Sequence, residues 1–93
     1  LDAKNIIARI NAFHPDPGSW FNFKGSRIKI IKAIEVKIKG LPGEIINKDF
    51  TITCAQNAIK ILELKKEGKN TMTVKEFVKG NKLEIGFNIL NNV

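Results

Sequence analysis

Basic side chains are the residues of this sequence whose number and spacing could do chemistry. The chain has 93 residues, and 16 Lys and Arg against 9 Asp and Glu give a formal net charge of +7. Ammonium and guanidinium groups bind phosphate oxygens, so this excess on a small domain indicates an anionic partner and favours nucleic acid. The alternative is a surface enriched in Lys by an AT-rich genome, because Lys, Ile and Asn are all frequent here.

The basic residues gather in two segments of the chain. Residues 27–39 alternate between apolar and mostly basic side chains, and residues 60–82 carry further lysines. If the fold brings these segments together, they form a positive groove that follows a phosphate backbone. Lys69 is our first candidate for a phosphate contact and Lys29 the second. The predicted nucleic-acid-binding set is Arg27, Lys29, Lys32, Lys65, Lys66, Lys69, Lys75 and Lys79.

The residues that catalysis requires are few and scattered. His14 is the one histidine and lies in a proline-rich segment, where a solvated loop residue is expected. The sequence contains no H-E-x-x-H, G-x-S-x-G or Rossmann glycine pattern, and no carboxylates paired as acid and base. We therefore predict no catalytic residue, no metal site and no cofactor site in this chain.

Cys54 is the one cysteine, which excludes an internal disulfide and a cysteine zinc cluster. It shares the apolar positions of an alternating segment with Phe50 and Ile52. This pattern predicts a buried thiol, as is usual for a free cysteine. An unpaired cysteine also fits a reducing compartment.

Two residues could belong to either core or surface. Trp20, in the aromatic segment 20–23, could stack on nucleobases, but we favour a core position because aromatic residues supply much of a small domain's burial. Lys32 has the apolar parity of Ile30 and Ile34, and an unpartnered Lys is rarely buried. We expect the strand to bend there and the ammonium to reach the rim of the fold.

Periodicity predicts the element at the start of the chain. Apolar residues at helical spacing indicate a helix over residues 2–13, and Pro15 requires it to end. A turn-rich loop with two prolines follows over residues 14–19. The apolar face of the helix comprises Ile6, Ile7, Ile10 and Phe13.

A second helix is predicted over residues 74–79. Thr73 and Glu76 have the spacing of a capping box, and Met72 and Phe77 that of a hydrophobic staple around it. Gly80 suits a left-handed stop at the C-terminal end of the helix.

Between the helices, alternation and turn residues predict short strands. Lys24-Gly25-Ser26 reads as a hairpin turn, and residues 68–71 as a loop. We predict a mainly β fold, a small OB-like β-barrel of about five strands with an N-terminal helix and a short C-terminal helix. The five predicted strands cover residues 20–23, 27–39, 44–48, 50–54 and 59–66, and residues 82–87 are a candidate for a last strand.

The length corresponds to a single domain over residues 1–93. Every apolar stretch is interrupted by Lys or Glu within a few residues, so no membrane span or signal peptide is expected. The first residue is Leu and a helical pattern begins at once, from which we expect a domain excised from a larger protein.

Several short motifs, in order along the chain, resemble the C-terminal domain of methionyl-tRNA formyltransferases. Residues 11–20 resemble R-A-F-N-P-x-P-G-A/S-W, and residues 27–33 resemble x-L-K-I-x-K-A. Residues 41–45 match P-G-T-I/V, residues 64–72 resemble L-Q-P-E-G-K-K-P-M, and residues 75–80 resemble E/D-F-L-x-G. Each motif is weak alone, and their shared order makes the resemblance specific.

The sequence departs from this family pattern at a few places. His14 replaces the usual Asn, and residues 55–58 replace a Gly-Asp-Gly turn, so that hairpin is expected to differ. Asn70 replaces a residue that is commonly basic, whereas Lys65 and Lys66 stand in place of Gln-Pro.

The resemblance implies a parent enzyme that moves a formyl group from 10-formyltetrahydrofolate to the amino group of methionyl initiator tRNA. The catalytic set and folate site would lie in an N-terminal Rossmann-like domain outside this sequence. The implied partners are tRNA, held largely by its backbone, and that catalytic domain. A bacterial, cytoplasmic monomer is expected. The alternative is a structural C-terminal domain of a formyltransferase acting on nucleotide sugars or folate, with no RNA contact.

Overall fold

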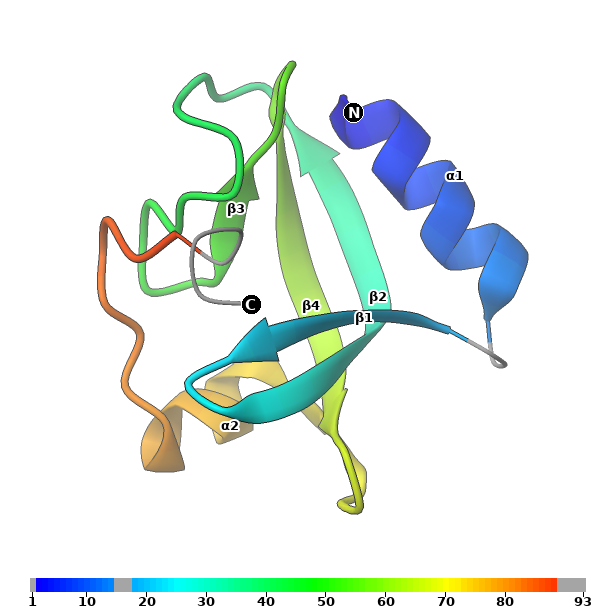
Figure 1. Ribbon diagram of the computed structural model, residues 1–93, viewed down its shortest axis with the longest axis vertical. Helices are drawn as coiled ribbons and strands as arrows, with labels where there is room; N and C mark the ends of the chain where they lie inside the picture. The colour runs from blue at the N-terminus through cyan, green and yellow to red at the C-terminus, as the bar shows by residue number, and fades with distance from the viewer. Residues whose placement is uncertain (1, 15–17, 89–93) are drawn as a thin grey trace.

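Residues 2–14 and 18–88 are described by the computed structural model, and they form one five-stranded sheet with two helices (Figure 1). The elements are α1 (Ala3–Phe13), β1 (Ser19–Phe23), β2 (Ser26–Val36), β3 (Thr51–Thr53), β4 (Ala58–Lys66), β5 (Thr71–Thr73) and α2 (Val74–Gly80). The antiparallel strands lie in the order β1-β2-β4-β3, and β5 pairs with the opposite end of β4 from β3. The predicted mainly β class with two flanking helices is confirmed.

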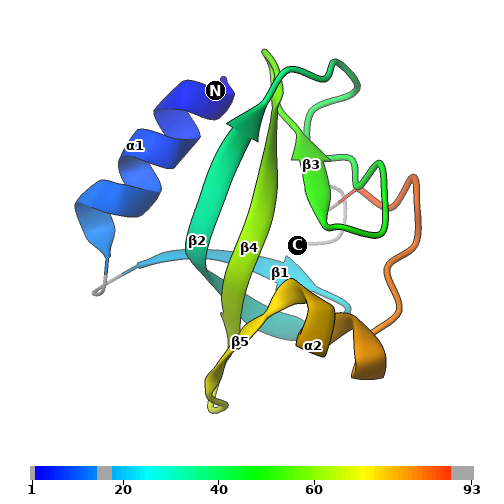
Figure 2. The same cartoon turned by 180° about the vertical axis from the view of Figure 1, so that it is seen from behind.

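The sheet is curled into a half-barrel, and its two long central strands are irregular where it bends. The register between β2 and β4 shifts between Ile30 and Lys32, and again between Lys32 and Ala33. Such bulges bend a strand and increase its twist, and β2 is strongly curved in Figure 2. Lys32 is exposed at this point, so the predicted bend that carries its side chain outward is confirmed.

The irregularity also changes which residues of β2 face inward. Ile28 is fully buried and Ile30 is 8% exposed, whereas Ile34 is 44% exposed. The expected continuous apolar face along residues 27–39 is therefore wrong beyond Lys32, because an inserted residue reverses the alternation of a strand. The strand also ends earlier than predicted, at Val36.

Aromatic rings fill the inside of the curled sheet. Phe50 has no exposed surface, and its ring centroid lies 5.6 Å from that of Phe23 and 5.9 Å from that of Phe77. Phe21 meets Phe50 edge to face at 5.8 Å, and Phe87 meets Phe23 at 5.4 Å. These spacings are those of favourable aromatic pairs, so strands, α2 and the C-terminal segment share one core.

The helix α1 packs against β2 (Figure 1). Asp2 caps its first turn, because the backbone N–H of Asn5 donates to Asp2 Oδ1 at 2.9 Å. Ile10 is buried and Ile6 and Ile7 pack against the core, which confirms the helix and most of its predicted apolar face. Phe13, predicted to share that face, is 44% exposed and does not belong to it.

The short helix α2 begins with the predicted capping box. The N–H of Glu76 donates to Thr73 Oγ1 at 3.2 Å, and the N–H of Thr73 donates to Glu76 Oε1 at 3.3 Å. The predicted left-handed stop is wrong, because Gly80 continues the helix without a positive φ. Asn81 ends the helix instead, and its Nδ2 donates to the carbonyl of Phe77 at 3.0 Å.

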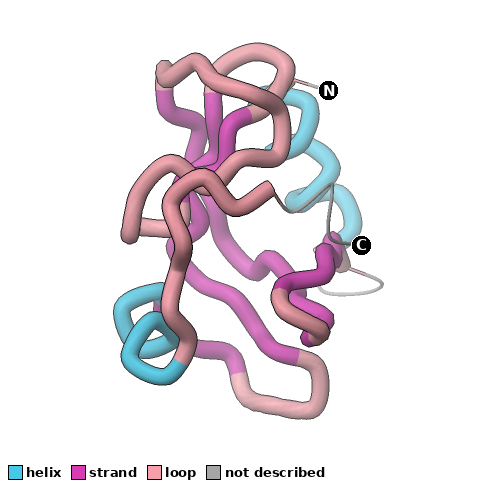
Figure 3. The backbone as a smooth tube through the Cα atoms, turned by 60° about the vertical axis from the view of Figure 1, so that its left-hand side comes forward, coloured by secondary structure: helices cyan, strands magenta, loops and turns pink. Residues whose placement is uncertain are grey.

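The predicted strand over residues 44–48 and the candidate strand over residues 82–87 are irregular segments rather than strands (Figure 3). They lie side by side, since the N–H of Ile45 donates to the carbonyl of Phe87 at 2.9 Å. Phe50 follows the first segment with a φ of +60°, a sharp turn that interrupts regular extension.

A strand that was not predicted, β5, overlaps residues 68–71, where we expected a loop. Its length of three residues is too short for alternation to be recognised. The staple residues Met72 and Phe77 both pack on the core, as predicted. Residues 15–17, which include the two prolines expected to fix the first loop, lie outside the described residues.

Candidate nucleic-acid interface

A row of side chains crosses the outer face of the sheet from β1 to β5. The register pairs Trp20 with Lys29, Lys29 with Lys65, and Lys65 with Thr71. Residues directly opposite one another on antiparallel strands point to the same side of a sheet. The adjacent residue Ile28 is fully buried, so the row lies on the side away from the core. We call this surface the sheet face; it comprises Trp20, Arg27, Lys29, Lys65 and Thr71.

The indole of Trp20 organises the basic groups on β2. The guanidinium carbon of Arg27 lies over the ring at 4.5 Å from its centroid, and Lys29 Nζ lies at 5.5 Å. Both distances fall within the range of cation–π attraction. Arg27 is held from a second side by Glu67, with Nη1 and Oε2 3.4 Å apart.

The prediction that Trp20 belongs to the core is wrong. The residue is half-buried and lies outside the core cluster that contains Phe23. In β1, Phe21 and Phe23 share one parity and point inward, so Trp20 must point outward. The alternation of Ser19-Trp20-Phe21-Asn22-Phe23 was the signal that could have placed it correctly.

Lys29, our second candidate for a phosphate contact, is only 7% exposed. Its aliphatic chain lies against Gly18, where a Cβ atom would clash with Lys29 Cε. Its ammonium is near the Trp20 ring. Lys29 therefore belongs to the sheet face but offers little of its own surface to a phosphate, because Gly18 and Trp20 lie against it.

The turn between β4 and β5 places Lys69 next to the sheet face, whereas Lys66, the last residue of β4, pairs with the inward-facing Ile28. The N–H of Glu67 donates to the carbonyl of Arg27 at 2.9 Å, and the N–H of Lys69 donates to the carbonyl of Lys66 at 2.8 Å. These bonds fix the turn against β2. Lys69 is exposed at its tip, whereas Lys65 and Lys66 are half-buried.

Few carboxylates neutralise these basic groups. In the part of the chain that the structure describes, ion pairs join Lys24 to Glu84 and Arg27 to Glu67. Lys32, another predicted site residue, belongs to neither ion pair, but the strand register places it opposite Glu63. The remaining predicted lysines of β4 and the β4–β5 turn without a carboxylate within 4 Å in the described residues are Lys65, Lys66 and Lys69.

The two remaining predicted residues, Lys75 and Lys79, lie on α2 rather than on the sheet face. They border two adjoining depressions between α2 and the loop that precedes β3, both lined by Lys48 and Val78. We call this region the α2 groove; its basic residues are Lys48, Lys60, Lys75, Lys79 and Lys82.

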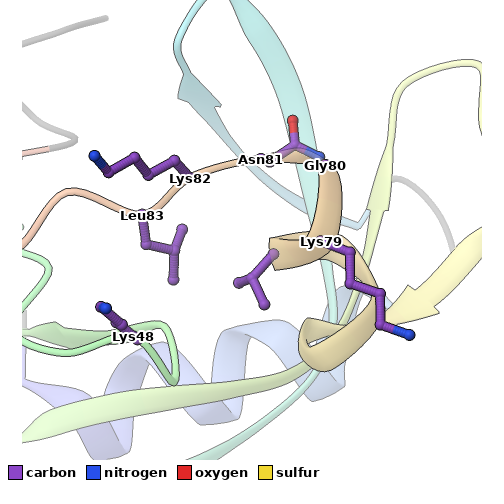
Figure 4. A pocket seen from close by; sticks show the side chains of 7 residues that line it. Lys48, Lys79, Gly80, Asn81, Lys82 and Leu83 are labelled. Carbon is purple, nitrogen blue, oxygen red and sulfur yellow. The ribbon is translucent and has the colours of Figure 1, made fainter.

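Figure 4 shows Leu83 pointing into the space between the Lys48 loop and α2, with the Lys79 side chain directed outward. The floor is therefore apolar and the charges lie on the rim. Lys48 was missed from the sequence, because no local pattern connects residue 48 to a helix that begins at Val74.

The groups considered for other chemistry do not assemble in the described residues. Within residues 2–14 and 18–88, no three His, Cys, Asp or Glu side chains are placed to hold a metal ion. None of the helices in that part of the chain is long and apolar enough to cross a membrane. His14 is exposed. Cys54 is buried, as predicted, and burial raises the pKa of its thiol.

A curled antiparallel sheet of five strands with two flanking helices defines a small, mainly β, OB-like domain. Comparison with known families identifies the domain further. A sequence model of the formyl transferase C-terminal domain matches residues 1–82. The chain belongs to this family, which confirms the resemblance drawn from its motifs.

The chain is also similar to several curated full-length proteins. It is 40% identical over 91 residues to the methionyl-tRNA formyltransferase of Pelagibacter ubique, covering 97% of this chain and 29% of that protein. For the methionyl-tRNA formyltransferase of Bradyrhizobium diazoefficiens, the identity is 35% over 88 residues, covering 90% and 28%. For that of Neisseria meningitidis it is 33% over 84 residues, covering 87% and 27%. The chain spans less than a third of the length of these relatives.

Proposed function

We propose that this chain is the tRNA-holding C-terminal domain of a methionyl-tRNA formyltransferase. The observation that carries the proposal is the group of basic side chains on the sheet face, continued by Lys69 in the β4–β5 turn. Among the described residues, Lys65 and Lys69 have no carboxylate within 4 Å. Such a surface binds a phosphate backbone by ion pairing and releases the counterions that surround it.

The rest of the reaction belongs to a catalytic domain of the same protein. That N-terminal domain would take the formyl group from 10-formyltetrahydrofolate and pass it to the methionyl amino group. The present chain, as a single domain, would supply tRNA binding without a cofactor of its own. A bacterial cytoplasmic monomer is part of the same proposal.

The predicted residues would divide the work by position. Lys69, exposed at the tip of its turn, is the leading phosphate contact, and Lys32 extends the surface along β2. Arg27 and Lys65 form the middle of the surface, whereas Lys66 lies opposite Ile28 at the end of β4 and adds its charge beside the surface. Lys29 is largely covered within the surface, and Lys75 and Lys79 add charge on the α2 groove.

A salt titration of tRNA binding tests the proposal. With about 4–6 phosphates contacted, the logarithm of the association constant should fall with the logarithm of salt concentration with a slope of about −3 to −4. The substitution Lys69→Ala should flatten that slope by roughly one unit and weaken all tRNAs alike. Lys4→Ala on α1 is the matched control, because it removes an exposed charge far from the β4–β5 turn (Figure 1).

Base edges in an A-form stem are poorly accessible, so initiator and elongator tRNA should bind with similar affinity. A strong preference for initiator tRNA would contradict a grip that reads only the backbone. A flat salt dependence would contradict the phosphate model and favour a structural domain that does not touch RNA.

A further inference from the structure

The contact between Arg27 and Trp20 has a geometry that a phosphate grip does not require. An ammonium or guanidinium binds a phosphate from any well-solvated position. Here the guanidinium lies over the indole at 4.5 Å from the ring centroid. Glu67 Oε2 lies 3.4 Å from Arg27 Nη1, so the guanidinium is contacted from two sides.

A planar guanidinium that lies over a ring has a second side directed away from that ring. The side chain of Arg27 remains 53% exposed despite its contacts with Trp20 and Glu67. Planar guanidinium groups stack on nucleobases as aromatic rings do, with a cation–π contribution. The solvent-exposed side of the Arg27 guanidinium therefore offers a surface on which a further planar group can stack.

We propose that the Arg27–Trp20 stack binds the base of an unpaired RNA nucleotide, adding a stacking subsite to the phosphate grip. The inference rests on the proposed function and specifies which part of an RNA the sheet face contacts. Bases within a stem have both faces covered by their neighbours, whereas loops, bulges and single-stranded ends offer a free face.

The surrounding charges fit a nucleotide rather than an apolar peptide. Lys65 lies one strand away from Lys29 in the register, and neighbouring strands are about 4.8 Å apart. A nucleotide stacked on Arg27 would thus have a lysine within reach of its phosphate. Lys65 and Lys66 have no carboxylate within 4 Å among the described residues.

Trp20 is the one tryptophan of the sequence, so its fluorescence reports on this site directly. The full 93-residue chain would be titrated with an oligoadenylate of about eight nucleotides, a length within the site size of small single-strand binders. A blunt RNA duplex is the second probe. We expect the single strand to quench Trp20 emission and the duplex to leave it nearly unchanged.

The substitution Arg27→Lys keeps the charge and removes the flat face. It should lower the ratio of single-strand to duplex affinity about ten-fold, the scale of one lost base stack. Lys69→Ala is the control, because loss of a phosphate contact should weaken both probes and leave their ratio unchanged. Urea melting of each variant checks that the fold is retained.

The outcomes separate this inference from the proposed function. If the single strand binds with a salt-dependent affinity but without quenching, the phosphate grip stands and the stacking subsite is refuted. If Arg27→Lys weakens both probes equally, Arg27 is a phosphate contact and the subsite is refuted again. If neither RNA binds with a salt-dependent affinity, both the inference and the proposed function are overturned.

Discussion

The sheet face and the α2 groove both collect basic side chains, but they hold them differently. On the sheet face, Arg27 is fixed between an indole and a carboxylate, and Lys29 is 7% exposed. Around the α2 groove, Lys75 and Lys79 are exposed on the rim of an apolar floor. Charge density is common to both regions, whereas fixed orientation belongs to the sheet face alone.

The difference in orientation distinguishes general electrostatic attraction from selective contact, which amino-acid composition alone cannot do. Exposed surface lysines contribute mainly to long-range attraction and to salt dependence. Groups with a fixed plane can select the shape of what they contact, because their geometry is set before binding. We therefore expect substitutions on the sheet face to change selectivity and those around the α2 groove to change affinity uniformly.

The largest expected effect on stability comes from removing the aromatic ring that packs α2 against the core. Phe77 is 1% exposed and contacts Phe50 and Phe23. Phe77→Ala should lower the free energy of unfolding by about 3–5 kcal/mol, measured by urea denaturation. Hydrogen exchange should accelerate first in α2, while β1 and β2 stay protected. Phe13→Ala, at a 44% exposed ring, is the control, and equal loss of protection in α2 and β2 would show that the regions are not separable.

A glycine substitution should disturb the sheet face alone. Gly18 has a φ of +80°, and a Cβ there would clash with the buried chain of Lys29. Gly18→Ala should cost about 1–3 kcal/mol in stability and shift the Trp20 emission as Lys29 moves. Gly80→Ala is a matched control, because Gly80 has open space around it and no positive φ. An unchanged Trp20 spectrum in Gly18→Ala would contradict the described packing.

A smaller effect is expected at the start of α2. Thr73→Ala removes the side-chain acceptor of the capping box and should cost about 1 kcal/mol by thermal or urea unfolding. Thr73→Ser should retain most of the stability, because its hydroxyl can still accept from the N–H of Glu76. Loss of the same size in both variants would mean that the methyl group, and not the cap, stabilises this helix.

The smallest change in stability is expected for the rim of the α2 groove. Lys75→Ala and Lys79→Ala together should alter the free energy of unfolding by no more than about 0.5 kcal/mol. If each residue contacts a phosphate, the salt slope of tRNA binding should flatten by about 0.7–0.9 per contact. The ratio of single-strand to duplex affinity should stay constant. A change in that ratio would show that the α2 groove also contributes to selectivity, as the sheet face is expected to do.

Much of the fold could be predicted because it depends on short-range patterns. The capping box of Thr73 and Glu76 and the hairpin at Lys24-Gly25 each involve residues a few positions apart. The bend at Lys32 was predictable for a different reason. A lysine at an apolar position of a long strand indicated that the alternation could not continue unbroken.

The errors have physical causes that lie beyond local pattern. Residues 44–48 alternate weakly as a strand would, but Phe50 turns the chain at φ +60° so that its ring enters the core. Residues 82–87 then bond to this irregular segment rather than to a strand. Both outcomes depend on contacts between residues far apart in the sequence, such as Phe50 with Phe23 and Ile45 with Phe87.

The candidate site likewise has features that the sequence predicts and features that depend on the tertiary structure. The sequence by itself determined the excess of positive charge, the two segments that carry it and the family to which the chain belongs. Only the tertiary structure decided that Arg27 lies over Trp20, that Lys29 is buried and that Lys48 joins the lysines of α2. Composition and short motifs are properties of the chain, whereas the facing of a side chain depends on strand register, and register is set by pairing between distant segments.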